Sequence, residues 1–579
     1  MAFRAYTITG FFGLLLACIV PLPAAAQAST GMTVKLHADR SVVGMGRSVI
    51  VTATVTGNND VPVSGVQLWP YLNGKQWGAS ETTDRTGRAI FFLPLPYPGT
   101  ARIEAIIGPS GSGQKETFPV GSPQPKDGIR SNEVQVRVKS RTIRRVIRDP
   151  EHLVGVEWEP WFTPLNAHWD TAEAIPVLGR YNSFNADVIR QHALWMTEAG
   201  IDFLLVDWSN NLWGKQHWSE RAPGVDELIR ATTLLLDTYA QMRGEGIPVP
   251  QITLLLGLDN GPQTTTTALN EEMQWIYEHY VTNPRYRDLW VWYEGKPLIV
   301  PFNGGGPNVL KGQPPLDESK FTVRWMASQL QADHFDRDGY WSWMDGSLQP
   351  ITTYSGGMPE ALTITPAFFG DGGWTYPQAL GRRGGATYLQ QWETASTQRP
   401  HFLLINQWNE FAGQPNGGGY GPKKDQYVDC YSADLSNDIE PTSPTACAYR
   451  GCGGWGFTYL NLTRALIALY HQPSPGSTLL TVSEPQPSAT VSGPTLSVRW
   501  TVAGKPVRSF SLKVDGRTVA RSVTGNAAIL DMSRFASGRH ILTVLAEGAR
   551  SRFPLSPIRE DDDLPTLQPV SAQVAFFKK

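Results

Sequence analysis

The sequence has almost no net charge and few histidines or cysteines. Its 579 residues include 50 Lys or Arg and 52 Asp or Glu, so the formal net charge is only -2. A chain this close to neutral has no general attraction to nucleic acid or to an anionic membrane surface, and neither is expected as a partner. The ten histidines are scattered without a ligand spacing, so the sequence requires no metal or other cofactor.

Long hydrophobic runs are also missing. The apolar run near the N-terminus, 11–20, is shorter than a membrane span, and prolines and small residues follow it up to Ala28. This pattern predicts a signal peptide over 1–28, and therefore a chain exported to the periplasm or outside the cell, without a transmembrane segment. The lipobox-like run 15–18 offers a lipid anchor on Cys18 as an alternative, but the apolar residues that continue past Cys18 favour cleavage.

Cysteine is rare, and only three cysteines remain once Cys18 is removed. Cys430, Cys447 and Cys452 lie in one loop-like region. Because export permits disulfides and no histidine lies nearby, we expect one structural disulfide and one leftover thiol rather than a metal site. The pairing among the three stays open.

Short alternating runs typical of β-sandwiches occupy both flanks of the chain. Within 29–145, apolar residues alternate with threonines over 49–56, and Gly, Pro, Asn and Asp divide the runs. The turn and strand at 83–91 resemble bacterial Ig-like domains of the invasin type, which implies a spacer more than a sugar-binding module. Residues 473–579 are expected to form a second, smaller sandwich with a solvated acidic loop at 559–563.

The middle of the chain, 146–472, alternates longer helical patterns with apolar strands, as parallel α/β folds do. Asn185 is expected to cap a helix that ends at Gly200, and a second helix is expected from Pro223. The eight expected strands are 153–158, 203–208, 252–258, 297–302, 321–326, 340–344, 362–366 and 402–408. The predicted fold is therefore a central (β/α)8 TIM-type barrel between an N-terminal Ig-like β-sandwich and a small C-terminal β-sandwich.

Acidic residues follow several of these strands, where a TIM barrel builds its active site. Strict alternation along the first strand places Glu157 and Glu159 on the same face. The acids at strand ends are Glu157, Glu159, Asp207, Asp259, Asp345 and Glu410. Cleavage of a glycosidic bond needs one carboxyl group to protonate the leaving oxygen, and usually a second to activate water or attack the anomeric carbon. This set can provide both, although Asp259, Asn260 and Asp345 would suit Ca²⁺ if they converged.

Aromatic and amide side chains accompany the acids. Of the 20 tryptophans, 17 lie between Trp158 and Trp455, and flat aromatic rings are a usual means of holding a sugar. The residues expected to bind substrate are Glu159, Trp161, His168, Trp169, Trp208, Asn210, Asp259, Asn260, Trp408 and Asn409.

Three segments resemble glycoside hydrolase family 99 and the WbsX-like proteins. They are 155–169 with its Glu-Pro-Trp-Phe run, 199–208, and 406–410, which is similar to the family's Asn-Glu-Trp signature. The resemblance covers roughly residues 153 to 470 and implies a (β/α)8 enzyme that cuts α-mannosides with two glutamates three residues apart. Glu410 matches the first glutamate, but Gly413 stands at the second position.

The resemblance therefore implies catalysis by Glu410 with a partner from elsewhere in the chain. The candidate partners, in order, are Asp207, Glu157, Glu159 and Asp259. We predict an exported glycoside hydrolase that cleaves a polysaccharide with Glu410 and with Asp207 or Glu157. The alternatives are a non-catalytic carbohydrate-binding or polysaccharide-assembly protein, and an adhesin that binds through its two sandwiches.

Overall fold

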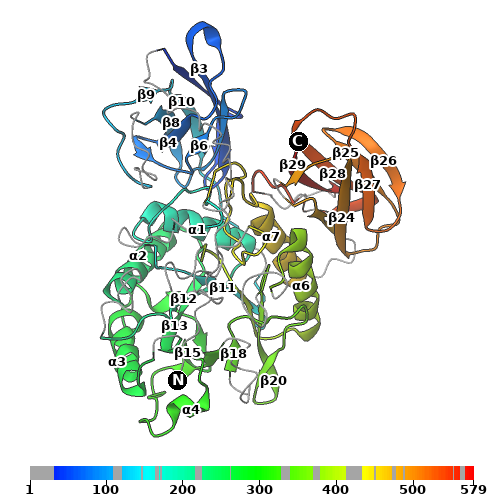
Figure 1. The fold of residues 1–579 in the computed structure, drawn as a ribbon. Helices are drawn as coiled ribbons and strands as arrows, with labels where there is room; N and C mark the ends of the chain where they lie inside the picture. The colour runs from blue at the N-terminus through cyan, green and yellow to red at the C-terminus, as the bar shows by residue number, and fades with distance from the viewer. Residues whose placement is uncertain are drawn as a thin grey trace, which may run out of the picture.

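The computed structural model describes most of the chain beyond residue 30 (Figure 1). The described residues are 31–108, 120–144, 148–162, 169, 172–214, 225–260, 263–327, 340–368, 379–411, 433–448, 451–471, 478–486, 489–551, 553, 555–560 and 568–579. The expected signal peptide lies outside them, as do His168, Gly413 and Cys430. Within these ranges, no helix is long and apolar enough to cross a membrane.

Residues 33–139 form two β-sheets. The smaller sheet has the antiparallel order β1 (Thr33–Ala38), β3 (Ser48–Thr56), β7 (Arg88–Pro94). The larger has the order β2 (Val42–Gly44), β10 (Val134–Lys139), β8 (Gly99–Ile107), β4 (Gln67–Leu72), β5 (Lys75–Gln76), with β6 (Glu81–Thr82) and β9 (Ile129–Arg130) paired beside it. On β3 the alternation is as predicted, because its apolar residues are buried and the threonines between them are partly exposed.

The central sheet contains eight parallel strands that curve into a nearly closed barrel. Their order is β18 (Tyr340–Ser342), β17 (Trp325–Ala327), β15 (Lys296–Asn303), β13 (Gln251–Asp259), β12 (Phe203–Trp208), β11 (Leu153–Trp158), β21 (Phe402–Ile405) and β20 (Met358–Ile364). Each lies at a strand position that the sequence predicted. Between β18 and β20, the hydroxyl of Thr363 donates a hydrogen bond to the carbonyl of Ser342 in place of strand pairing.

In the part of the barrel region that the structure describes, the helices beside this sheet are fewer than a complete (β/α)8 alternation requires. Those of two turns or more are α1 (Ala186–Ala199), α2 (Val225–Gly244), α3 (Thr266–Ile276), α6 (Ala386–Gln398) and α7 (Thr458–His471). After β15 there is only the four-residue α4 (Pro307–Leu310), and β20 is preceded by a hairpin strand, β19 (Thr353–Ser355). In the described residues the predicted alternation of strands and helices is therefore incomplete. The short α4 and the hairpin of β19 and β20 occur where the sequence lacks helical periodicity. Two further short strands, β14 (Trp292–Tyr293) and β16 (Thr322–Val323), pair with β15.

Helix α1 begins and ends as the sequence predicts. The side chain of Asn185 accepts hydrogen bonds from the backbone N–H groups of Asp187 and Val188, which have no partner within the helix. Gly200 ends the helix at φ 95°, in the left-handed region that favours glycine. The expected start of α2 at Pro223 lies outside the described residues.

Alternation along the barrel strands separates two layers of side chains. On β12, Leu204, Val206 and Trp208 join the core beneath the helices, whereas Phe203 and Leu205 join a second core inside the barrel. On β11, Leu153 likewise lies inside the barrel. Since the side-chain period of a strand is two, Glu157 and Asp207 continue the inner rows to the ends of their strands. The barrel thus carries these two acids to its carboxyl-terminal opening.

The C-terminal part has two further sheets around a core of its own. One has the order β22 (Thr478–Glu484), β24 (Thr495–Gly504), β27 (Ala527–Asp531). The other has the order β23 (Thr490–Val491), β29 (Gln568–Lys578), β28 (Gly538–Ser551), β25 (Phe510–Val514), β26 (Arg517–Val523). In Figure 1 these orange and red strands lie beside α6 and α7, and the blue N-terminal sheets lie beyond α1.

The sequence predicted a disulfide in the cysteine-bearing region but missed the contacts made by the acidic segment at 559–563. Cys447 and Cys452 form a disulfide, which resolves the open pairing in favour of the two nearest cysteines. The expectation of a solvated acidic loop is wrong at Glu560, which is buried. Its carboxylate accepts hydrogen bonds from the backbone and hydroxyl of Ser48, at 3.1 and 2.8 Å, and from the indole of Trp195 at 3.0 Å. This segment therefore joins the N-terminal sheets to α1.

The inner layer of the barrel depends on a glycine at Gly155. A β-carbon there would lie 2.3 Å from the ring of Phe203, which is fully buried and packs edge-on against Phe402. We expect Gly155→Ala to lower the free energy of unfolding by about 1–3 kcal/mol, because the ring cannot leave the closed barrel. Denaturant titration followed by tryptophan fluorescence measures this, since most tryptophans lie in the barrel region.

The matched control is Gly244→Ala at the exposed end of α2, where a β-carbon would meet nothing within 4 Å. This variant should keep the stability of the parent chain or exceed it. Equal stability of the two variants would contradict the packing assigned to Gly155.

Candidate active site

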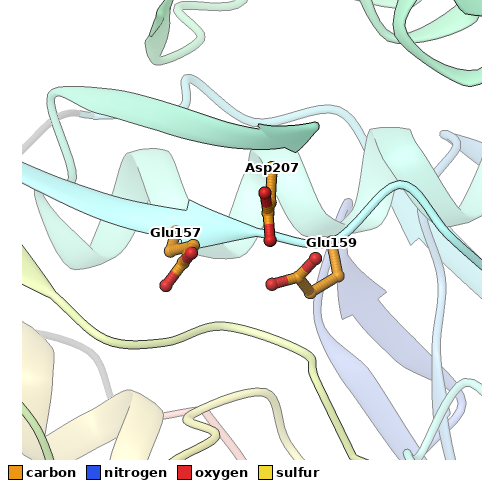
Figure 2. A group of neighbouring side chains, drawn as sticks. All are labelled: Glu157, Glu159 and Asp207. Atoms are coloured by element: carbon orange, nitrogen blue, oxygen red, sulfur yellow. The ribbon is translucent and has the colours of Figure 1, made fainter. Parts of the chain in front are cut away.

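Three acids that the sequence proposed come together at the ends of β11 and β12. Glu157 is on β11, Glu159 follows it in the chain, and Asp207 is near the end of β12. One carboxylate oxygen of each lies within 4.8 Å of the others. Figure 2 shows the three carboxyl groups on the same side of the two strands, with that of Glu159 turned toward the other two. All three are buried, and Asp207 is the most exposed of them, at 7%.

Glu157 is held by hydrogen-bond donors from two other strand ends. The indole N–H of Trp343, just after β18, lies 2.9 and 2.8 Å from its two oxygens. The side-chain amide of Asn406, just after β21, donates to Oε2 at 2.5 Å. Asn437 in turn donates to the side-chain oxygen of Asn406 at 2.6 Å, which fixes the orientation of that amide. Both oxygens of Glu157 therefore accept hydrogen bonds.

Asp207 is positioned by the turn that follows β12. The backbone N–H of Ser209 donates to its Oδ1 at 2.5 Å. The amide of Asn260 donates to the hydroxyl of Ser209 at 2.7 Å and to the side-chain oxygen of Asn210 at 3.2 Å. This turn crosses close above Gly257 on β13, where a β-carbon would lie 2.3 Å from the carbonyl oxygen of Ser209. Asn210 and Asn260 thus meet beside Asp207, as two of the residues expected to bind substrate.

Glu159 is positioned through its backbone. Asn409 accepts a hydrogen bond from the N–H of Glu159 at 2.8 Å and donates to its carbonyl at 3.3 Å. The same amide of Asn409 donates to the hydroxyl of Tyr181 at 3.1 Å, and Tyr181 donates to Glu440 at 2.6 Å. His192 on α1 contacts the other oxygen of Glu440 at 3.0 Å. A buried chain of polar contacts therefore connects Glu159 to the helix layer.

Glu410 lies on the segment after β21 and is 6% exposed. Its carboxylate accepts a hydrogen bond from the side-chain amide of Gln407. Its backbone N–H, and that of Phe411 at 2.9 Å, donate to the carboxylate of Asp438. Asp438 thus fixes the turn that presents Glu410.

Burial and mutual repulsion raise the pKa values of these acids. Burial raises the pKa of Asp207 to about 6, against the hydrogen bonds from Ser209, which act to lower it. Burial, and next the charge of Asp207, hold the pKa of Glu157 and of Glu159 well above the usual range of a glutamate. The charge of Glu410 raises both pKa values further, so this acid belongs to the same electrostatic group. Burial raises the pKa of Asp438 to about 7.

The tryptophans expected to stack on sugar are more deeply buried than that role requires. Trp208 and Trp408 are fully buried, and the indole N–H of Trp208 donates to Thr232 of α2 at 2.9 Å, on the helix side of the sheet. Trp161 belongs to the same core. Trp169 is partly exposed, but it stacks on Phe162 with ring centroids 4.4 Å apart.

The remaining expected residues are separate from the acid group. Asp259 lies against the turn after β15, since a β-carbon on Gly305 would be 2.7 Å from its carboxylate. The carboxylate of Asp345 accepts hydrogen bonds from the hydroxyl of Ser342 and the N–H of Ile351. Both of these partners come from the segment 342–351 around Asp345. His168 and Gly413 lie outside the described residues.

Sequence reasoning missed several residues that hold the site. Trp343 lies within the predicted strand 340–344 and belongs to no acid pair or motif, so nothing in the sequence singled it out. Tyr181 and His192 precede β12 by many residues and meet Glu440 only in the folded chain.

No protein-family model matches the chain, and no curated protein sequence matches it. Among solved structures, the family 99 endo-α-mannosidase of Bacteroides thetaiotaomicron is similar at 15% identity and a TM-score of 0.38, over 56% of this chain and 98% of that one. A β-glucuronidase of Bacteroides uniformis is similar at 9% identity and a TM-score of 0.33, over 94% of this chain and 61% of that one. A protein described as a putative β-galactosidase of Bacteroides fragilis is similar at 12% identity and a TM-score of 0.28, over 95% of this chain and 74% of that one. The function is accordingly argued from the side chains of the site.

Proposed function

We propose that the chain is a glycoside hydrolase that cleaves a polysaccharide by carboxylate acid/base catalysis at the opening of a TIM-type barrel. The observation that carries the proposal is the meeting of Glu157, Glu159 and Asp207 within 4.8 Å, with Glu410 in the same electrostatic group. Glycosidic cleavage is a reaction that two carboxyl groups perform when their surroundings separate their protonation states.

Within this group we assign the chemistry to Glu410 and Asp207. They are the two most exposed of the four acids, at 6% and 7%, and a sugar has to reach the groups that act on it. Both oxygens of Glu157 already accept hydrogen bonds from Trp343 and Asn406, so we assign Glu157 a supporting role. In this scheme one of the pair protonates the leaving oxygen. The other activates water or attacks the anomeric carbon.

The resemblance to family 99 supports the assignment of Glu410. That family pairs two glutamates three residues apart, and Gly413 removes the second of them here. A partner from another strand is therefore needed, and Asp207 fills that need. An α-linked glycan is the substrate that the resemblance suggests.

Replacement of either acid by its amide tests the assignment. Glu410→Gln and Asp207→Asn should each lower kcat/KM by about 10²- to 10⁴-fold, because a positioned acid or base contributes that much to the reaction. The measurement is reducing-end release from α-mannans, α-glucans, arabinans and bacterial exopolysaccharides. Glu393→Gln, on the exposed face of α6, is the matched control and should keep full activity.

The outcomes separate the rival functions. Equal activity of wild type and Glu410→Gln would move the chemistry to the other acids of the group. Retention of a glycan on affinity electrophoresis, without release of reducing ends by the wild type, would favour a non-catalytic carbohydrate-binding protein. Binding by the isolated flanking sheets alone would favour an adhesin.

The pH dependence follows from the raised pKa of Asp207. As the base or nucleophile of the pair with Glu410, Asp207 acts only when ionised, so kcat/KM should fall as the pH drops through about 6. The effect on stability has the opposite sign, because the folded chain holds this proton more tightly than the unfolded chain. The contribution of Asp207 to the free energy of unfolding is thus largest below about pH 4 and declines as the pH rises toward 6. An acid limb near pH 4 in the rate profile would contradict the role of Asp207.

We propose further that the chain is exported after removal of 1–28, and that residues 29–145 form an Ig-like spacer. The disulfide between Cys447 and Cys452 supports export, because such bonds persist in oxidising compartments. In a bacterial host, mass spectrometry of the periplasmic and culture fractions should find a chain that starts after Ala28. Cys18→Ser should leave cleavage of the signal peptide unchanged. If cleavage instead depended on a lipid anchor at Cys18, this variant would stay uncleaved.

A further inference from the structure

The candidate site contains more acid than glycoside hydrolysis needs. Two carboxyl groups suffice for that reaction, and the site holds four. Within the described residues, Glu157 accepts hydrogen bonds from the N–H groups of Trp343 and Asn406. Asp207 is hydrogen-bonded to the backbone and side chain of Ser209 and to the carboxyl group of Glu159. No Lys or Arg of those ranges pairs with any of the three. Burying like charges without a cation is unfavourable, so the group has to take up either protons, which the raised pKa values of Glu157 and Glu159 reflect, or a cationic ligand.

Glu159 shows this need most clearly. It is 1% exposed, and its Oε2 has no hydrogen-bond partner. Figure 2 shows its carboxyl group directed toward Asp207 and Glu157 rather than into the surrounding protein. A buried carboxylate oxygen without a partner is costly unless a ligand completes it.

The surroundings favour an organic ammonium group over a metal ion. Calcium takes six to eight oxygen ligands, but Trp343 and Asn406 turn N–H groups toward Glu157, and these cannot bind a metal. An ammonium group carries three N–H donors and needs one oxygen for each. In this group each of three carboxyl groups offers one oxygen, and these oxygens all lie within 4.8 Å of one another.

We propose that the substrate is an amino-sugar polymer with free amines, whose ammonium group binds among Glu157, Glu159 and Asp207. The inference rests on the proposed glycosidase function and names its substrate class. An amine on C2 is one carbon away from the anomeric centre. A carboxyl group that acts on that centre must therefore lie beside the carboxyl groups that hold the amine. Asp207 meets this condition, because it lies beside Glu157 and Glu159. An N-acetylated sugar has neither the charge nor the three donors.

Binding is tested separately from turnover, on the full chain. Isothermal titration with glucosamine, galactosamine and mannosamine, each beside its N-acetylated form, is performed at about pH 6.5, where a sugar amine is protonated. At least one amine should bind about tenfold or more tightly than its N-acetylated form. Glu159→Gln should abolish this preference. Glu272→Gln, at a buried acid on α3 remote in sequence from the group, should keep it.

Hydrolysis is measured in parallel on fully de-N-acetylated and N-acetylated forms of the same oligosaccharides, with and without CaCl₂ or EDTA. Preferred binding and cleavage of the amine forms supports both proposals. Preferred binding without cleavage supports the ammonium site and refutes the hydrolase. Cleavage of neutral or N-acetylated glycans, without an amine preference in binding, overturns the ammonium site and leaves the hydrolase standing. Stabilisation by calcium that is lost in Glu159→Gln and competes with amine also overturns it.

Discussion

Repulsion among Glu157, Glu159 and Asp207 is the constraint that the rest of the site has to satisfy. Their oxygens lie within 4.8 Å of one another in a place that water barely reaches. The donors that offset this repulsion come from separate strand ends, namely Trp343 after β18, Asn406 after β21 and Ser209 after β12. Asn406 is near Glu157 because β21 pairs directly with β11, but Trp343 reaches Glu157 only if the sheet curves far enough to bring β18 around to β11. The near closure of the barrel and the presence of the acid group therefore depend on each other.

A second layer of polar contacts holds the first in place. Trp158 donates to Nδ1 of His192 at 3.3 Å, so the proton of that ring lies on Nε2 and is directed at Glu440. From Glu440 the contacts run through Tyr181 and Asn409 to the backbone of Glu159. Every polar group in this series of contacts is buried, and each has a hydrogen-bond partner, as an ordered buried network requires.

Among the described residues near the site, the buried cation Arg382 does not neutralise the acid group. Arg382 lies over the rings of Trp455 and Tyr459, at 3.8 and 4.2 Å, and donates to the backbone carbonyl of Asp438 at 2.7 Å. Its charge lowers the pKa of Asp438, yet burial still raises that pKa to about 7. Asp438 supports the turn that carries Glu410, so the charge of Arg382 acts on the scaffold of the site.

The sequence predicted what depends on local periodicity and missed what depends on long-range contacts. Apolar runs between helical patterns located the eight strands, and period-two alternation gave the shared face of Glu157 and Glu159. The Asn185 cap and the Gly200 end bounded α1. Trp343 could not be predicted as a partner of Glu157, because 186 positions separate them and an indole has many possible uses in a core. Tryptophan enrichment was a poor guide to stacking surfaces, since Trp208 follows an outward-facing row of β12 and packs under α2.

The burial of those tryptophans bears on how the site recognises a ligand. Sugar binding through stacked rings needs an open aromatic face, and neither Trp208 nor Trp408 has one. What the described part of the opening presents instead is charge and amide, from the carboxyl groups of Asp207 and Glu410 and from Asn210 and Asn260. A pyranose offers only neutral hydroxyls to such a surface, and each hydroxyl can satisfy one carboxylate oxygen at a time. A protonated amine satisfies three and offsets their repulsion as well, which makes the composition of the opening itself an argument for a cationic sugar.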